Sequence, residues 1–306
     1  MALGKAVYGR LMALLAAILF GCESVAVQLC YADGFTVMGL IAVRYGLAAL
    51  LFGITLIFTR SPFWVAKEYR RQILILGLLF IASNWLLFIS LAYLSAPLAI
   101  LFFYAYPSLT AVVARFIYKE HLGMVKIYAL VISMLGLFML YWSSAGEISV
   151  LGTVVALAAA FLNALKLNMA EKVMSHVNVY TFSFDMAFIM CTFSIPLCLI
   201  CGQFPTAGIP ISGWLYAAGL ALFVSYGSML LINSSLKFVN AVDVSIICLM
   251  EPPVTALTAF LVFRDILSGW QIIGACLVML SVAVPQISQL KANKSEAGNK
   301  VENTER

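Results

Sequence analysis

Five ionisable side chains fall inside long apolar stretches of this chain of 306 residues: Glu23, Arg44, Lys166, Asp185 and Glu251. If these stretches cross a membrane, each ionised group costs at least ~2.5–3.5 kcal/mol and must be paired, hydrated or functional. Groups of this kind bind charged ligands or carry protons. The questions are therefore which of them pair with each other, and which are left for a ligand.

Matching depth along the stretches predicts two ion pairs. Glu23 and Arg44 each lie about eight residues, roughly 12 Å along a helix, from the adjoining ends of two consecutive stretches. Lys166 and Asp185 lie at matching depth near the adjoining ends of another consecutive pair. We therefore predict buried pairs between Glu23 and Arg44 and between Lys166 and Asp185. Each pair either joins neighbouring helices or lines a pathway where it meets a charged end of the substrate.

Glu251 has no partner at matching depth. It precedes Pro252 and Pro253, which lack amide N–H groups and disturb a helix. Interrupted helices near the midplane are where transporter sites form. The equivalent residue in the other half of the chain is Tyr106, just before Pro107, so both positions are predicted to face one polar cavity. Glu251 either binds substrate or a proton there, or is protonated and hydrogen-bonded within the helix packing.

Aromatic and amide side chains supply further candidates for a wall of the site. The aromatic residues are Trp85, Phe88, Tyr93, Phe102, Phe103, Tyr104, Tyr106 and Tyr226, and the amides are Asn84, Asn163, Asn168 and Asn233. Aromatic rings tolerate cations as well as apolar groups. The substrate-binding set predicted from the sequence is Glu251, Tyr106, Tyr104, Phe103, Trp85, Glu23, Arg44, Lys166 and Tyr226.

The elements that must position these residues are membrane spans. The chain is 64% apolar and 10% charged, with a mean hydropathy of +1.05, which is far from the composition of a soluble domain. A span needs about 20 apolar residues. We predict ten, at 10–31, 36–58, 72–93, 96–118, 124–142, 150–171, 179–201, 212–236, 241–263 and 268–288.

The spans fall into two copies of one unit. Residues 90–120 align with 235–265, and seven of the 31 positions are identical. Each copy holds five spans, an odd number, so the second is inverted in the membrane. We predict an all-α membrane protein of ten transmembrane helices in two inverted five-helix repeats, 1–145 and 146–290. A disordered cytoplasmic tail is expected at 291–306.

The basic residues orient the spans. With the N-terminus in the cytoplasm, 15 of the 18 Lys and Arg residues lie on cytoplasmic segments. The positive-inside rule therefore predicts cytoplasmic N- and C-termini in the cell membrane. These charges flank apolar spans, so the bilayer is the expected partner and nucleic acid is not.

The chain resembles the EamA-type members of the drug/metabolite transporter superfamily over about residues 10–288. The resemblance rests on Pro107 with Lys119-Glu120, and on Glu251-Pro252 with Arg264-Asp265. Arg44 also resembles the arginine usual in the family's second span. Two positions depart from the pattern: Asp265 stands where glutamate is usual, and Asp185 stands where the first-half counterpart is basic. The resemblance implies transport of a small metabolite without naming it.

The leading function is secondary transport or export of an amino acid, with an organic cation as the alternative and protons as a possible coupling ion. A membrane-embedded protein that is not a transporter is the remaining option. The chain has neither HExxH nor GxSxG, and its seven cysteines have no metal-binding spacing, so no enzyme, metal or cofactor is expected. A channel is disfavoured because the repeats place unlike residues at equivalent sites. The oligomeric state is open, and a monomer is compatible with the sequence.

Overall fold

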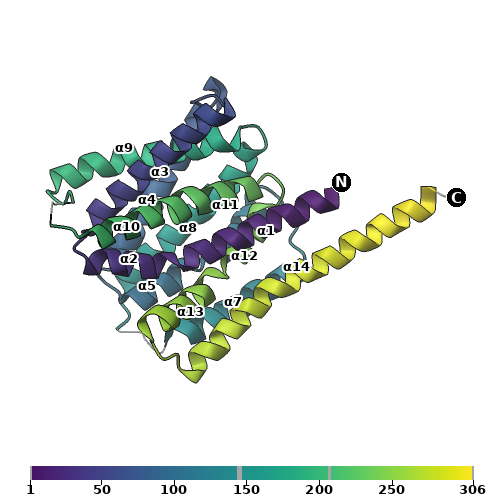
Figure 1. The fold of residues 1–306 in the computed structure, drawn as a ribbon. Coiled ribbons are helices and arrows are strands. Elements are labelled where there is room, and N and C mark those ends of the chain that lie inside the picture. Colours follow the sequence, from purple (N-terminus) through teal and green to yellow (C-terminus); the bar gives the residue numbers. More distant parts are fainter. Residues whose placement is uncertain (1, 143–146, 206–207, 305–306) are drawn as a thin grey trace.

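Ten helical spans make up the part of the chain described by the computed structural model, which comprises residues 2–142, 147–205 and 208–304. The spans lie side by side, and both termini project from the same end of the bundle (Figure 1). This confirms the fold class expected from the sequence. The spans are Gly4–Ala32, Val37–Thr59, Lys67–Ser90, Ala96–Phe116, Met124–Tyr141, Val150–Met174, Val179–Ile200, Ile211–Ser235, Ala241–Phe263 and Gly269–Ser288.

Several spans are built from more than one helix. The first repeat contains α1 (Ala2–Gly21), α2 (Glu23–Ala32), α3 (Val37–Thr59), α4 (Arg70–Ser90), α5 (Ala96–Phe103), α6 (Tyr106–Phe116) and α7 (Met124–Tyr141). The second contains α8 (Val150–Met174), α9 (Val179–Ile200), α10 (Ile211–Gly219), a π-helical stretch (Leu220–Ser228), α11 (Met229–Ser235), α12 (Ala241–Cys248), α13 (Glu251–Phe263) and α14 (Gly269–Thr304). A single 3₁₀ turn, Lys67–Tyr69, leads into α4.

Spans four and nine, which are equivalent in the internal repeat, also share a break in the helical backbone. Span four breaks between α5 and α6 at Tyr104, and span nine breaks between α12 and α13 at Leu249. Both breaks come just before proline, at the first turn of the following helix. Lys119 and Arg264, which the repeat alignment superposes, both adopt left-handed backbone with φ of 55° and 58°. The interruption predicted at Pro252 and Pro253 is thus confirmed.

Small residues hold the inner helices together. Ala13, Ala17, Ala156, Ala160 and Ala164 are fully buried on α1 and α8, as expected for helices whose backbones approach closely in lipid. Around them α4 packs along α8, α3 along α9, and α14 along α7. The last two pairs lie on opposite flanks of the bundle in Figure 1.

The bundle has two ends, which are named here by their connecting segments. The terminal side carries the N-terminus and the segments 60–66, 117–123, 175–178 and 236–240. The opposite side carries 33–36, 91–95 and 264–268. The predicted repeat boundary between residues 145 and 146 lies outside the described residues.

The C-terminal segment differs from the expectation. The sequence predicts a disordered tail at 291–306, whereas α14 continues without interruption to Thr304. Extending an existing helix fixes one residue for each new hydrogen bond, and this segment contains the helix formers Lys, Ala and Glu.

Candidate functional site

A cavity of about 550 Å³ lies inside the bundle between the two repeats. Its volume is within the range of roughly 300–1,000 Å³ typical of small-molecule sites. Its charged lining residues are Glu23, Arg44, Lys166 and Glu251. These are four of the five intramembrane charges singled out in the sequence, so the structure brings them together.

The two broken spans meet at this cavity. Tyr104 lies in the break of span four, Tyr106 starts α6, and Glu251 starts α13, and all three line the cavity. The side chain of Tyr104 lies close to the Glu251 carboxylate, and that of Tyr106 lies close to the Cys248 thiol. Glu251 forms no ion pair with any described residue. The breaks therefore present a carboxylate among phenol rings.

A third break brings Glu23 to the same place. Span one is interrupted at Cys22, and the freed Gly21 carbonyl accepts hydrogen bonds from Thr255 Oγ1 at 3.0 Å and Thr258 Oγ1 at 3.3 Å. Both threonines lie on the Glu251 face of α13 at helical spacing. Thr255 also lines the cavity, whereas Thr258 does not. This contact fixes the start of α2, and so Glu23, beside α13.

The predicted pair between Glu23 and Arg44 is confirmed. Arg44 Nη1 donates to Glu23 Oε1, and Arg44 Nε donates to Ser225 Oγ at 3.0 Å. Ser225 belongs to the π-helical stretch of span eight, a type of irregularity common at functional sites. Arg44 is therefore held by a charge on α2 and by a hydroxyl from the second repeat.

The predicted pair between Lys166 and Asp185 is wrong. Lys166 Nζ lies 4.5 Å from the centre of the Phe80 ring, inside the cavity. Asp185 is buried elsewhere and accepts a hydrogen bond from the Val65 amide at 3.2 Å. The reason is that α8 packs along α4 whereas α9 packs along α3, so equal depth does not bring the two side chains together.

The aromatic candidates divide into two groups. Phe103, Tyr104 and Tyr106 line the cavity, and Tyr141 from span five joins them. The Tyr104 ring stacks near Tyr141 with centroids 6.5 Å apart, and Phe103 lies 5.6 Å from Tyr106. Four rings thus form a wall beside Glu251.

Trp85 and Tyr226, both expected in the site, lie outside its lining. Trp85 packs edge-on against Phe193, with ring centroids 6.2 Å apart. The Tyr226 hydroxyl shares a hydrogen bond of 2.8 Å with Thr55, and its ring contacts Phe52. Both side chains support helix packing, so the structure corrects these two assignments.

Three of the four amide candidates line the cavity. Asn84 donates to the Phe80 carbonyl at 2.7 Å, Asn233 donates to Ser183 at 2.9 Å, and Asn163 lies one helical turn before Lys166. Asn168 is fully buried and donates to the Thr110 carbonyl at 3.2 Å.

The cavity is more exposed towards the opposite side. Gln28 and Ala96, near the opposite-side ends of their spans, are exposed while lining it. Ala170, Phe182 and Leu236, which line it near the terminal side, are buried. The cavity therefore has a mouth on the opposite side and a floor on the terminal side.

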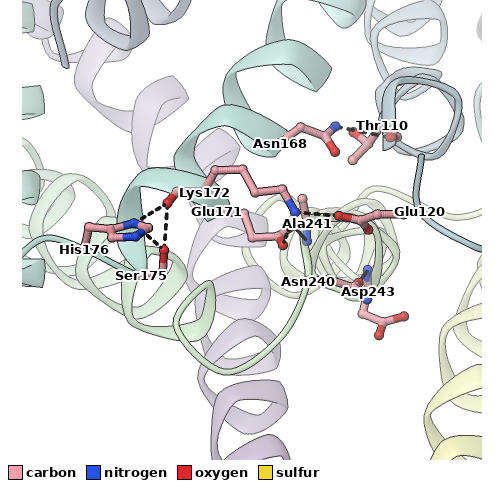
Figure 2. Close-up of polar contacts among 10 residues, drawn as sticks. All are labelled: Thr110, Glu120, Asn168, Glu171, Lys172, Ser175, His176, Asn240, Ala241 and Asp243. Atoms are coloured by element: carbon pink, nitrogen blue, oxygen red, sulfur yellow. Dashed lines mark hydrogen bonds and ion pairs between the residues drawn. The ribbon is translucent and has the colours of Figure 1, made fainter. Parts of the chain in front are cut away.

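Beneath the floor, polar contacts join the ends of three spans (Figure 2). Lys172 Nζ contacts Glu120 Oε1 at 2.6 Å and Glu171 Oε1 at 3.0 Å. Glu171 Oε2 accepts from the Ala241 amide at 2.7 Å, at the start of α12. Lys172 also lies 5.3 Å above the Tyr118 ring, and desolvation raises the pKa of this phenol despite the nearby ammonium group. These contacts close the terminal side between spans four, six and nine.

A neighbouring pair reinforces the closure. Lys126 Nζ lies 2.7 Å from Asp243 Oδ1 and so links span five to span nine. The amide of Asp243 is capped by Asn240 Oδ1 at 2.8 Å. The start of span nine is therefore fixed from two directions.

A second hollow, of about 610 Å³, lies between α6 and α7 and suits lipid better than a polar substrate. It is lined mainly by apolar residues such as Val112, Phe116 and Val131, which are exposed on the surface of the bundle. Within the described ranges, no cluster of three or more His, Cys, Asp or Glu residues could hold a metal ion.

Sequence reasoning missed several residues that line the site, among them Phe80, Tyr141, Ser225 and Gln28. Tyr141 and Gln28 are polar groups near the ends of apolar spans, which is a weak signal. No sequence pattern marks the π-helical stretch that directs Ser225 to Arg44. The break at Cys22 lacks a proline, so it too had no signal.

Comparison with known proteins shows similarity to transporters. Residues 7–142 and 150–284 each match the model of the EamA-like transporter family. An uncharacterized transporter, sll1319, from Synechocystis sp. (strain ATCC 27184 / PCC 6803 / Kazusa) is 25% identical over 202 residues. That match covers 65% of this chain and 61% of the relative, less than two thirds of its length. A protein of known crystal structure has the same fold, with a TM-score of 0.79 at 15% identity over 91% of this chain and 96% of that one.

Proposed function

Because the chain belongs to the EamA-like transporter family, we propose that it is a secondary active transporter that exports an amino acid. The observation that carries this proposal is the Glu251 carboxylate, which forms no ion pair with any described residue and faces aromatic rings in the cavity between the repeats. A carboxylate among rings is suited to an ammonium group. Such a group is common to all amino acids.

The basic residues support an orientation in the cell membrane. Of the 17 Lys and Arg residues in the described part of the chain, 14 lie at or near the terminal side. We therefore assign this side, with both termini, to the cytoplasm. The mouth of the cavity then faces away from the cytoplasm.

Alternating access follows from the two ends of the cavity. In the conformation described, Gln28 and Ala96 leave the outer end exposed, while Glu171, Lys172 and Ala241 close the inner end. Inverted repeats make a second state accessible by exchanging the roles of the two ends. The inner contacts must open before a cytoplasmic substrate can enter.

A counterflow experiment tests the function. Purified protein in liposomes preloaded with one amino acid should accumulate the same labelled amino acid, and the best member of a panel of twenty should also raise the Tm. Glu251→Gln should lower the binding of that amino acid by roughly 10- to 100-fold, because it removes a charge-assisted contact. Glu68→Gln, on the exposed 3₁₀ turn, is the matched control. If no member of the panel binds or exchanges, the amino acid assignment fails.

An organic cation is the second candidate, favoured by the same carboxylate and rings. Quaternary ammonium ions lack hydrogen-bond donors and bind to aromatic faces. Tetramethylammonium and choline belong in the same panel. If they exchange and the amino acids do not, this alternative replaces the first.

Glu251 is also the group we assign to proton coupling. Glu251→Gln removes the titratable carboxyl group and keeps its size, so it should abolish pH-driven accumulation, while counterflow persists when the substrate concentration is raised about 10- to 100-fold to offset the weaker binding. Initial rates across a range of pH in liposomes measure both. If the variant keeps the pH dependence of the wild type, the proton role is excluded.

A further inference from the structure

Two cations line the cavity, and only one of them is available to a ligand. Arg44 is committed to the Glu23 carboxylate and to Ser225, and its side chain is 11% exposed. The charges of Glu23 and Arg44 cancel. A ligand that took Arg44 would have to displace Glu23 and leave that carboxylate without its partner, at a cost typical of breaking a buried ion pair.

Lys166 is in the reverse situation. Its Nζ lies over the Phe80 ring, and no described residue forms a hydrogen bond or an ion pair with it. Asp185, the carboxylate expected to neutralise it, accepts a hydrogen bond from the Val65 amide instead. Lys166 is half-buried and faces the cavity. The contact with Phe80 holds the ammonium group without neutralising its charge.

With one pair cancelled, the cavity keeps one positive and one negative group, Lys166 and Glu251. Both line the same cavity, and they make no ion pair with each other, so each is available to a ligand there. Asn163 lies three residues before Lys166, on the same face of α8, and also lines the cavity. Its amide nitrogen is a second donor next to the ammonium group.

We propose that Lys166, and not Arg44, binds the carboxylate of the substrate, so that the transported molecule is a zwitterion and not a simple cation. This inference rests on the proposed function and adds to it the residue, Lys166, that would bind the carboxylate of the amino acid. A simple cation would meet Glu251 favourably but would leave Lys166 uncompensated and close by.

The first test uses the unaltered protein. The amino acid that stabilises it most is compared with its methyl ester and with the amine that lacks the carboxyl group, all by thermal shift and by competition in counterflow. Both compounds keep the ammonium group and lose the negative charge. They should bind about 10- to 100-fold more weakly than the amino acid, the effect of losing a hydrogen bond to a charged group.

Three variants then assign the effect to Lys166. Lys166→Gln should remove the preference for the amino acid over its ester. Lys166→Arg should keep it, since guanidinium is always charged. Lys237→Gln, on the terminal-side segment 236–240, is the control for loss of a positive charge elsewhere.

The outcomes separate this inference from the proposed function. If neither amino acids nor amines bind the unaltered protein, the proposed function fails. If amino acids bind but their esters bind equally well, or if Lys166→Gln keeps the preference, the assignment of Lys166 is overturned while the proposed function stands. Should Lys166→Gln fail to fold, the ester comparison on the unaltered protein and the Lys166→Arg variant still decide the question.

Discussion

Spans four and nine break at equivalent places, whereas spans one and six do not. Helices α6 and α13 begin at Tyr106 and Glu251, and the shift between these residues equals the shift that aligns the two repeats. Spans one and six align at a shift of 143, which places Ala13, Ala17 and Gly21 over Ala156, Ala160 and Ala164. Span one breaks at Cys22, just before Glu23, while α8 runs unbroken through Lys166, the residue equivalent to Glu23. The repeats thus share a scaffold and differ where they meet the cavity.

The equivalent residues Tyr106 and Glu251, and likewise Glu23 and Lys166, all line the cavity. An exact two-fold arrangement would offer two identical half-sites, as in a uniform pore. Here the first repeat has the phenol of Tyr106 where the second has the carboxylate of Glu251. It has the carboxylate of Glu23 where the second has the ammonium group of Lys166. Because of this asymmetry the cavity has different charged groups at different places in its lining. Such a lining suits a dipolar substrate, whereas a uniform channel would not require it.

The largest effect should come from the ion pair of the first repeat. Glu23→Arg or Arg44→Glu alone leaves two like charges in a partly buried site and should lower the free energy of unfolding by about 3–5 kcal/mol. The double swap should regain most of this loss. Asp185→Asn in the second repeat should cost only ~1 kcal/mol, because Asp185 accepts one backbone hydrogen bond.

Thermal unfolding of the wild type, the two single variants, the double swap and Asp185→Asn in detergent measures these differences. A double swap no more stable than the single variants would contradict the pairing. A double swap that folds normally but transports nothing would show that the pair also serves the substrate, so the purely structural interpretation would fail.

Exchange of Tyr106 and Glu251 should have the next largest effect. Glu251→Tyr should reduce counterflow roughly 100-fold, equivalent to ~2.7 kcal/mol. Adding Tyr106→Glu should not restore transport, because Lys166 remains on α8 and the new carboxylate lies on the wrong span. Initial rates for the single and double variants provide the measurement, with Tyr106→Phe as the conservative control. Full recovery in the double variant would mean that the two positions are interchangeable.

Much of this arrangement is predictable from the sequence, for specific physical reasons. Apolar length fixes the ten spans, and the prolines at 107, 252 and 253 mark the breaks of spans four and nine. Depth matching found the pair of Glu23 and Arg44 because both side chains also face the same cavity.

The other contacts of the site depend on which side of each helix points towards the cavity. The depth of a residue in its span does not determine this. Lys166 and Asp185 match in depth but project from helices packed on different neighbours, α4 and α3. Tyr226 lies in a π-helical stretch, where the α-helical period fails to predict the face. The break at Cys22 arises from tertiary contact, since Thr255 and Thr258 supply the hydrogen bonds for the Gly21 carbonyl.

That contact yields a smaller prediction about the equivalent positions Gly21 and Ala164. A Cβ built on Gly21 would lie 2.6 Å from Val254 Cβ and 3.0 Å from the Glu251 carbonyl oxygen. Gly21→Ala, which copies the residue of the second repeat, should therefore destabilise the protein by about 1–3 kcal/mol through overpacking. It should also reduce transport by displacing Glu251.

The reverse change, Ala164→Gly, should cost about 1–2 kcal/mol through helix propensity and the loss of a buried methyl group, and should leave substrate preference unaltered. Thermal unfolding and counterflow of both variants make the comparison. If Gly21→Ala is as stable and active as the wild type, the close crossing of α1 and α13 is not what positions Glu251.

The smallest effect concerns Glu120 and Asp265, the equivalent acids at the two ends of the cavity. Glu120 is bound to Lys172, whereas Asp265 is exposed and has no ion-pair partner among the described residues. Partly exposed pairs contribute about 0.2–1 kcal/mol, so Glu120→Gln should shift the population open towards the terminal side by up to about fivefold. Asp265→Asn should shift it by much less.

A cysteine at Ala170 on the cavity floor reports the change, in a background without the seven native cysteines. Its labelling by a membrane-impermeant maleimide from the terminal side should be faster in Glu120→Gln than in the parent, and unaltered in Asp265→Asn. Equal acceleration in both variants would mean that the two ends are energetically alike. The closure of the terminal side would then rest on the remaining contacts, which are Glu171 with the Ala241 amide and Lys126 with Asp243, and Glu171→Gln would test the first of them by the same labelling.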